Sequence, residues 1–145
     1  MIYPKLLLIP LIVGLICFSL KIIIKSMKGT FSWKLSSTYG GMPSIHTALV
    51  VSLTTVVGLA EGIFSASFAL SAIFSLIIIR DAVGYRRYLG IHSQVLNNII
   101  NEHPNKDRIK YPSHLQEQLG HTPAEAVVGA LIGFVAAVLL YIIIP

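Results

Sequence analysis

Apolar residues are concentrated in long blocks separated by short polar segments. Three blocks are clear, at residues 6–20, 63–79 and 126–144. A helix that crosses the hydrocarbon core of a bilayer needs roughly 17–25 mostly apolar residues, so each block is typical of a membrane-spanning helix. Residues 43–60 are less apolar because they include His46, serines and threonines, but their length is sufficient for a further span.

This pattern predicts an all-α integral membrane bundle with about four transmembrane spans and a short amphipathic or interfacial helix. The spans are expected at about 6–24, 43–60, 63–79 and 123–144, within a single membrane domain over residues 1–145. Only Glu61 and Gly62 separate the second and third spans, which indicates a tight helical hairpin. Pro43 suits the first turn of the second helix, where its missing N–H is not needed.

The polar segment 80–121 connects the third and fourth spans. Within it, Val95, Leu96, Ile99 and Ile100 fit one face of a short amphipathic helix, which could lie in the membrane interface or cover a site. Residues 103–112 are expected to form an exposed loop, since Pro104, Asn105 and charged residues occur there.

Composition supports the membrane assignment. Hydrophobic residues make up 54% and charged residues 12% of the 145 residues, whereas a soluble domain has about 25% charged residues. Cys17 is the single cysteine, which excludes an intrachain disulfide and a cysteine-based metal cluster. Lys5 precedes an apolar run, as in a signal peptide, but no small-x-small cleavage site follows. We therefore expect an uncleaved span.

The net charge is +5, and its distribution predicts orientation rather than nucleic-acid binding. Ten of the eleven basic residues flank the apolar spans on one side of the predicted topology: Lys21, Lys25, Lys28, Lys34, Arg80, Arg86, Arg87, Lys106, Arg108 and Lys110. Only Lys5 falls on the other side. The positive-inside rule therefore places the two basic segments in the cytoplasm and both termini outside.

The first polar cluster, Gly40 to His46, precedes the second span. A glycine turn that leads into a helix offers free backbone N–H groups at the positive end of the helix dipole, which is a natural anion site. Ser44 could add a hydroxyl donor, although a plain helix N-cap explains Ser44 equally well. His46 lies at the edge of a span, where an ionisable residue is costly and is therefore a functional candidate.

The third cluster, Gly120 to Glu125, places His121 and Glu125 four residues apart, on one face of a helix. A carboxylate that accepts from one imidazole nitrogen fixes the tautomer and leaves the other nitrogen as a nucleophile. The alternative is a simple ion pair at a helix start, where an acidic residue suits the dipole. An apolar span follows Glu125 directly, which favours a functional role.

The second cluster combines Asp81 with Arg86 and Arg87. Guanidinium groups match phosphate oxygens in bidentate fashion, although arginines at the end of a span also serve as topology anchors. Which of the two arginines faces a site is undetermined from sequence. In the four-span topology all three clusters fall at the same membrane face, which is the main reason to combine them into one site.

These motifs resemble the type 2 phosphatidic-acid phosphatase superfamily, which includes acid phosphatases and vanadium haloperoxidases. Pro43 to His46 is similar to its Pro-Ser-Gly-His motif, and His121 to Glu125 is similar to its His-x-x-x-Asp element. The set formed by residues 40–46, 81–87, 94–97 and 119–125 resembles the superfamily's small divergent branch. Members of that branch have been linked to dephosphorylating phosphatidylglycerol phosphate.

The resemblance implies that His121 is a nucleophile that forms a phosphohistidine, that Glu125 orients it, and that His46 is the general acid. Ser44 matches the phosphate cradle. Two departures change this assignment. Ile45 replaces the motif glycine, and the superfamily's basic motifs are missing, so we expect Arg86, Arg87 and Lys34, together with Asp81, to complete the phosphate site.

The sequence therefore predicts a lipid-phosphate phosphatase of a bacterial inner membrane, with its site facing the cytoplasm and phosphatidylglycerol phosphate as the expected substrate. The scheme requires no metal or other cofactor; a rival scheme places Mg²⁺ between Asp81 and Glu125. A second functional class is a non-catalytic binder or transporter of phosphorylated lipid, and a third is a structural membrane subunit. No nucleic-acid partner is expected. A homodimer is an open alternative, since four short spans could need a second copy to enclose a substrate.

Overall fold

The computed structural model describes residues 3–27, 29, 41–103 and 114–144. These residues form α1 (Tyr3–Met27), α3 (Ile45–Glu61), α4 (Ala66–Arg80), a π-helical turn (Asp81–Tyr85), α5 (Arg86–Glu102) and α6 (Pro123–Ile143). The described part of the chain contains no strand. The predicted all-α membrane bundle is confirmed.

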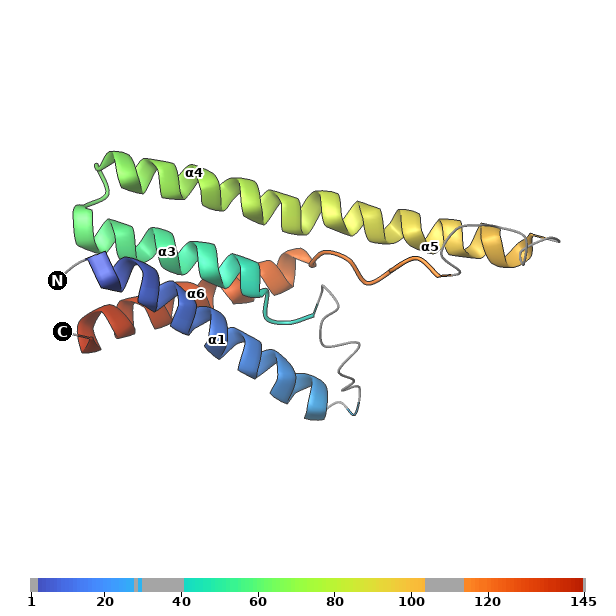
Figure 1. The fold of residues 1–145 in the computed structure, drawn as a ribbon, viewed down its shortest axis with the longest axis horizontal. Coiled ribbons are helices and arrows are strands. Elements are labelled where there is room, and N and C mark those ends of the chain that lie inside the picture. The colour runs from blue at the N-terminus through green and yellow to red at the C-terminus, as the bar shows by residue number, and fades with distance from the viewer. Residues whose placement is uncertain (1–2, 28, 30–40, 104–113, 145) are drawn as a thin grey trace.

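The helices α1, α3, α4 and α6 lie alongside one another, and each runs opposite to the one before it (Figure 1). Both termini consequently lie at one end of the bundle. The starts of α3 and α6 lie at the other end, near the junction of α4 with α5, and α1 also ends toward that side. Helix α3 is central because it packs against α1, α4 and α6.

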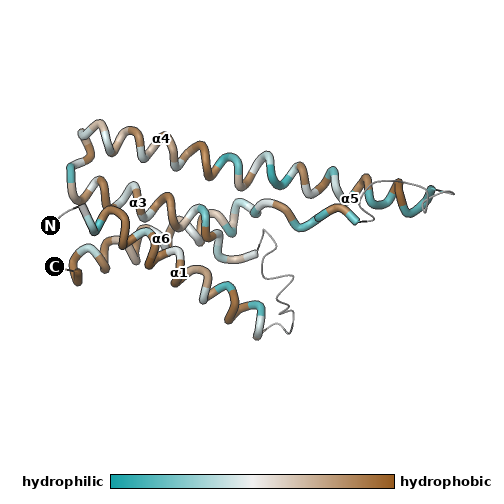
Figure 2. Tube along the Cα trace, viewed as in Figure 1, coloured by the Kyte–Doolittle hydropathy of each residue, from teal (hydrophilic) through white to brown (hydrophobic). Residues whose placement is uncertain are grey.

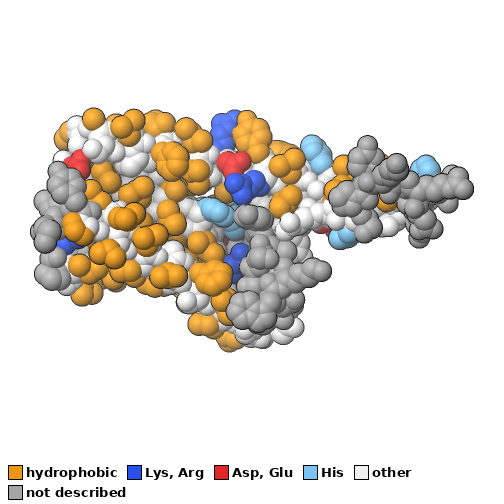
Figure 3. Space-filling view, in the orientation of Figure 1, with side chains coloured by type: hydrophobic (Ala, Val, Ile, Leu, Met, Phe, Trp, Pro, Cys, Tyr) orange, Lys and Arg blue, Asp and Glu red, His pale blue; other side chains and the backbone are white. Residues whose placement is uncertain are grey.

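Three helices of the described chain are long and apolar enough to cross a membrane: Pro4–Met27, the continuous helix Ala66–Glu102 and Pro123–Ile143. Apolar side chains cover the visible face of the bundle (Figure 3), whereas α5 is more polar (Figure 2). Helix α3 has 17 residues, which gives about 25 Å at 1.5 Å per residue. It can be shorter and more polar because its neighbours cover much of its surface.

Small residues bring α3 and α6 into close contact. Gly129 and Gly133 are four residues apart on the buried face of α6, and Ala137 continues that face. A Cβ atom at Gly129 would collide with the backbone oxygen of Ser44, and one at Gly133 with that of Ala48. Glycines at this spacing let two helix backbones approach closely in a membrane, and here they place the starts of α3 and α6 next to each other.

Hydroxyl groups join α3 to α4. Thr54 Oγ1 lies 2.7 Å from Ser75 Oγ, and Ser75 Oγ donates to the Val50 oxygen at 3.0 Å. This contact accounts for Thr54, since hydroxyls can bond between helices in lipid, whereas Ser52 and Thr55 donate to carbonyl oxygens of their own helix. The predicted hairpin is present with Gly62 at φ 86° at its corner, but its connection is residues 62–65 instead of Glu61 and Gly62, because Glu61 belongs to α3 and α4 starts at Ala66.

The structure differs from the sequence prediction in two boundaries. The amphipathic helix is not a short separate element: α5 follows α4 through the π turn without interruption, because no proline occurs between residue 66 and Pro104. Pro43 is not in the first turn of α3, since Ser44 is the N-cap and the helix starts at Ile45. Most of the predicted loop 103–112 lies outside the described residues.

Candidate active site

The His121 side chain lies directly before α6 and is held by Glu125 from the first turn of that helix. His121 Nδ1 is 3.1 Å from Glu125 Oε2, and the His121 side chain is only 4% exposed. If the Nδ1–H group donates this hydrogen bond to the carboxylate, Nε2 is unprotonated and keeps its lone pair. The predicted histidine–carboxylate contact is present, but the prediction that both residues lie on one helical face was wrong, because His121 precedes the N-cap Thr122 and only Glu125 lies in α6.

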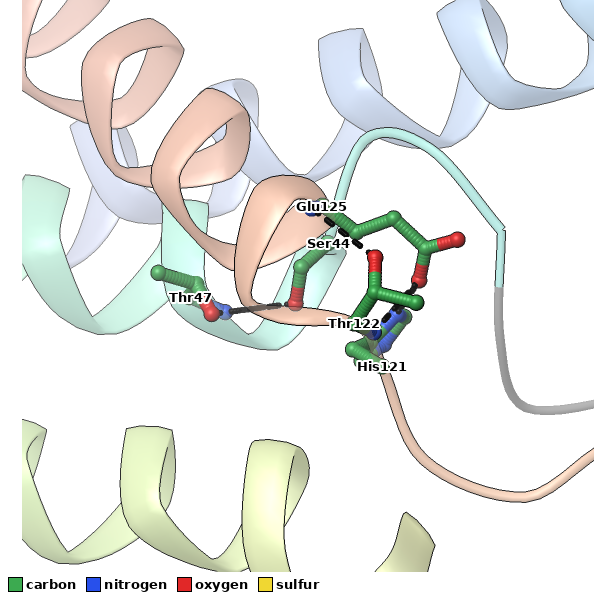
Figure 4. A network of polar contacts seen from close by, with 5 residues as sticks. All are labelled: Ser44, Thr47, His121, Thr122 and Glu125. Atoms are coloured by element: carbon green, nitrogen blue, oxygen red, sulfur yellow. Dashed lines mark hydrogen bonds and ion pairs between the residues drawn. The ribbon is translucent and has the colours of Figure 1, made fainter.

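Glu125 also caps α6. Its Oε2 accepts from the Thr122 backbone N–H at 3.1 Å, while Thr122 Oγ1 accepts from the Glu125 N–H at 3.3 Å. This reciprocal pair is a capping box (Figure 4). The carboxylate that contacts His121 is therefore restrained by the helix start, which limits the rotation of both side chains. The Thr-x-x-Glu pattern is the sequence signal for this role.

The π turn holds the backbone of His121. The Arg86 N–H bonds to the Asp81 oxygen, five residues earlier, and the Ala82 oxygen accepts instead from the His121 N–H at 2.9 Å. Single π turns inside α-helices are frequent at functional sites. Gly120 sits at φ 78°, and a Cβ atom there would collide with the backbone of Arg86 and Arg87. Only glycine permits this approach.

His46 lies one residue after the first residue of α3 and is exposed. Its ring centroid is 6.1 Å from that of His121, with a tilt of 59° between the ring planes. The two helix starts are joined directly, because the backbone N–H of Ser44 donates to the backbone carbonyl oxygen of Glu125 at 3.2 Å. The structure thus brings together the three residues expected to carry the chemistry, although their roles remain predictions.

Ser44 is placed as a helix cap rather than as an open phosphate ligand. It is fully buried, its Oγ accepts from the Thr47 N–H at 3.4 Å, and it lies 3.0 Å from Thr47 Oγ1 (Figure 4). The neighbouring Ile45 side chain packs against the hydrophobic core. Of the two interpretations of Ser44, the geometry favours the N-cap.

The two arginines have different surroundings. Arg86 Nε donates to Asp81 Oδ2 at 2.6 Å. The Asp81 carboxylate is therefore the ion-pair partner of Arg86. Arg87 is exposed and lines a pocket that His121 and Glu125 also line. Figure 3 shows basic, acidic and histidine side chains gathered where α5 leaves the apolar bundle. Lys34 lies outside the described residues.

This pocket has a volume of about 270 Å³ and lies between α5 and the segment that leads into α6. Its lining combines polar and apolar surface from these residues: Gly41, Arg87, Gly90, Ile91, Gln94, Glu117, Gln118, Leu119, Gly120, His121, Thr122 and Glu125. Asn97 on α5 stabilises the far wall, because its side chain bonds the backbone of Leu115 and the carboxylate of Glu117.

Burial lowers the pKa of His121 below its ordinary value of 6.5, because the imidazolium form loses hydration. The hydrogen bond and the negative charge of Glu125 act in the opposite direction, and the positive charges of Lys21 and Arg86 lower the pKa further. The ring is therefore neutral at pH 7. A neutral imidazole with one bonded nitrogen is the form in which histidine attacks an electrophile.

Within the described residues, no three His, Cys, Asp or Glu side chains are grouped closely enough to hold a metal ion. Asp81 contacts Arg86 and Glu125 contacts His121, so the two carboxylates of the rival Mg²⁺ scheme have separate partners. That the reaction needs no metal stays a prediction, which activity measured in the presence of a chelator would test.

Sequence reasoning missed three features of the site. It treated Lys21 only as the end of a span, whereas the structure buries this lysine. It did not identify the capping box or the contact between the π turn and His121. The capping box has a four-residue signature, but the π turn has no local sequence signal, since it depends on a contact with a distant segment.

The fold and site define a helical membrane protein with a histidine–carboxylate pair at one end of its bundle. The chain belongs to the divergent PAP2 family, whose model matches residues 3–136. It is also 36% identical over 118 residues to the uncharacterized membrane protein YuiD of Bacillus subtilis (strain 168). The matched segment covers 74% of this chain and 75% of that protein. No solved structure matches the chain.

Proposed function

We propose that the protein is a membrane phosphatase that removes a terminal phosphate from a lipid. The observation that carries this proposal is the buried His121, bonded to Glu125 at 3.1 Å, with the His46 ring 6.1 Å away between centroids. One phosphate ester could contact both rings. Membership of the divergent PAP2 family supports a phosphatase-related role.

The proposed reaction has two steps. His121 Nε2 attacks phosphorus while the bond from phosphorus to the lipid oxygen breaks, and His46 gives that departing oxygen a proton. Water then gives a proton to His46 and attacks phosphorus, the phosphorus–nitrogen bond breaks, and inorganic phosphate leaves, which restores both His121 and the protonated His46. Arg87 at the pocket wall would stabilise the charge on the equatorial phosphate oxygens.

We infer a substrate with a small head group, and phosphatidylglycerol phosphate is our specific candidate. The pocket volume of about 270 Å³ lies just below the usual range of ligand pockets, which is roughly 300 to 1,000 Å³. Such a pocket suits a phosphate with a glycerol-sized group. The basic residues around it would also attract anionic lipid, at about 1 kcal/mol for each lysine or arginine near the surface.

Phosphate release from purified protein in lipid micelles tests this function. We expect release from phosphatidylglycerol phosphate, with slower release from phosphatidic acid. The same assay with a strong chelator tests the Mg²⁺ scheme, since activity that survives chelation excludes it. A protein that binds these lipids and never releases phosphate would instead be the non-catalytic binder, an alternative favoured by the buried hydroxyl of Ser44.

We further propose that the site faces the cytoplasm of a bacterial cell. The support is the distribution of basic residues and the positive-inside rule. Single cysteines placed at Asn105 and Ser65 in a Cys17→Ser background provide the test. A membrane-impermeant thiol reagent added to intact cells should label position 65 and miss position 105. Labelling of position 105 from outside would overturn this orientation.

A further inference from the structure

Lys21 continues the buried face of α1. Ile9, Val13 and Cys17 follow one another at intervals of four residues and are fully buried, and Lys21 is next in this row with 7% exposure. Residues four apart share one face of a helix. The lysine therefore projects toward the other helices, whereas a lysine that only anchors a span extends toward the membrane surface.

The lysine side chain lies beside Gly41, at the edge of the candidate active site. Its Cε lies 3.6 Å from the position that a Cβ atom would take at Gly41, and Gly41 lines the same pocket as His121. Its charge acts electrostatically on Glu125 and on both histidine rings. Helix α1 thus contributes a cation to a site whose other members come from α3, the π turn, α5 and α6.

An ion pair with a neighbouring carboxylate does not explain why Lys21 is buried. Within the described part of the chain, no carboxylate lies within ion-pair distance of its ammonium; Glu125 contacts His121 and Asp81 contacts Arg86. A charged side chain inside a membrane span is costly, and such residues usually serve a substrate or ion site. An anionic ligand beside His121 would compensate this charge.

We propose that the Lys21 ammonium binds the phosphate group of a phosphomonoester whose phosphorus faces His121. The proposal rests on the proposed function for the class of ligand, not for turnover. An ammonium presents a compact charge with three donors, so it can follow the phosphate oxygens during transfer. Lys21 would then be a substrate-binding residue, while His121 performs the attack.

Equilibrium binding to purified protein in detergent tests this proposal, with three phosphate sources as probes. These are inorganic phosphate, soluble glycerol phosphate, and phosphatidic acid in mixed micelles. Lys21→Gln should weaken binding of all three by roughly 10- to 100-fold, because hydrogen bonds to charged groups are strong. Loss confined to phosphatidic acid identifies the lipid head group as the ligand, and loss shared by all three identifies phosphate itself.

Matched variants separate ligand binding from general effects of charge. Arg80→Gln removes an exposed positive charge near the same end of the bundle and should change binding by less than about twofold. Lys21→Arg retains the charge and should recover most of the affinity. Binding by Lys21→Gln within about twofold of the wild-type value overturns the proposal, as does a wild-type protein that binds none of the probes.

A second measurement uses only the wild-type protein, so it does not depend on whether a substituted protein folds. Reductive methylation of the wild-type protein, read by mass spectrometry, should modify Lys21 less in saturating phosphate, while Lys5 at the other end of α1 is modified equally in both conditions. Equal modification of Lys21 with and without phosphate would overturn the proposal.

If binding depends on Lys21 but no phosphate is ever released, the binding role holds and the phosphatase function fails. If phosphate is released and Lys21→Gln leaves KM unchanged, the reverse is true.

Discussion

The starts of α3 and α6 make an informative comparison, because both helices begin at the same end of the bundle with a hydroxyl N-cap and a histidine beside it. At the start of α6, His121 is buried and bonded to a carboxylate. At the start of α3, His46 is exposed, and the cap hydroxyl of Ser44 faces Thr47 rather than the histidine. Similar local sequence thus produces one restrained histidine and one accessible histidine.

This difference suits the two roles that we propose for these histidines. A nucleophile benefits from a fixed tautomer and a fixed direction of attack, both of which Glu125 supplies to His121. A general acid must exchange protons with solvent between turnovers, which suits an exposed ring. Substitutions at one helix start at a time test whether the two histidines differ in this way.

The largest effect is expected from His121→Asn. Loss of the attacking nitrogen should reduce phosphate release from a lipid phosphate by about 10³-fold or more, since nucleophile removal is among the most severe changes in an enzyme. His92→Asn is the matched control, because this exposed histidine lies on α5 outside the pocket. A decrease of less than about tenfold, which is roughly 1.4 kcal/mol of barrier, would contradict the assignment.

A smaller effect is expected from His46→Gln, and it should depend on the leaving group. A general acid contributes roughly 10²- to 10⁴-fold when the departing alkoxide is a poor leaving group. With p-nitrophenyl phosphate, whose leaving group needs little protonation, the loss should be several-fold smaller. Initial rates on both substrates provide the measurement, and equal losses would reject His46 as the acid.

The pair Glu125→Gln and Thr122→Ala separates orientation from capping. Glutamine can still accept at the helix start but loses the negative charge beside His121, so kcat should fall by about 10- to 100-fold with little loss of stability. Alanine at position 122 removes the cap hydroxyl and should lower stability by about 1 kcal/mol while keeping most of the activity. Thermal unfolding and kcat, measured together, should show opposite patterns.

The smallest expected effect concerns pH. His121 must be neutral to attack, and its pKa lies below 6.5, so activity should be lost only as the pH falls through that lowered value. In Glu125→Gln, the hydrogen bond and the charge that raise this pKa are weakened. The acidic limb of kcat/KM should therefore move to lower pH. Because the substrate phosphate itself titrates near pH 6, the difference between the two proteins is the informative quantity.

Much of this architecture follows from the sequence. The apolar blocks determine the helices, because backbone N–H and C=O groups in lipid must bond within one segment. Antiparallel crossing then places residues 40–46, 81–87 and 119–125 at one end, whatever the details of packing. The spacing of His121 and Glu125 predicted their pairing, but not its geometry. His121 precedes the N-cap of α6, and the Glu125 carboxylate reaches it from the first turn of the helix.

Other features depended on how the helices are rotated and which backbones touch. A helical period shows that Ile9, Val13, Cys17 and Lys21 share a face, but only contact with α3 and α6 shows that this face is buried. The π turn and Gly120 decide that Arg87 lines the pocket while Arg86 pairs with Asp81. The physical reason is that periodicity specifies positions around one helix axis, whereas the partner of a side chain depends on the approach of a second helix, which here is set by Gly129 and Gly133.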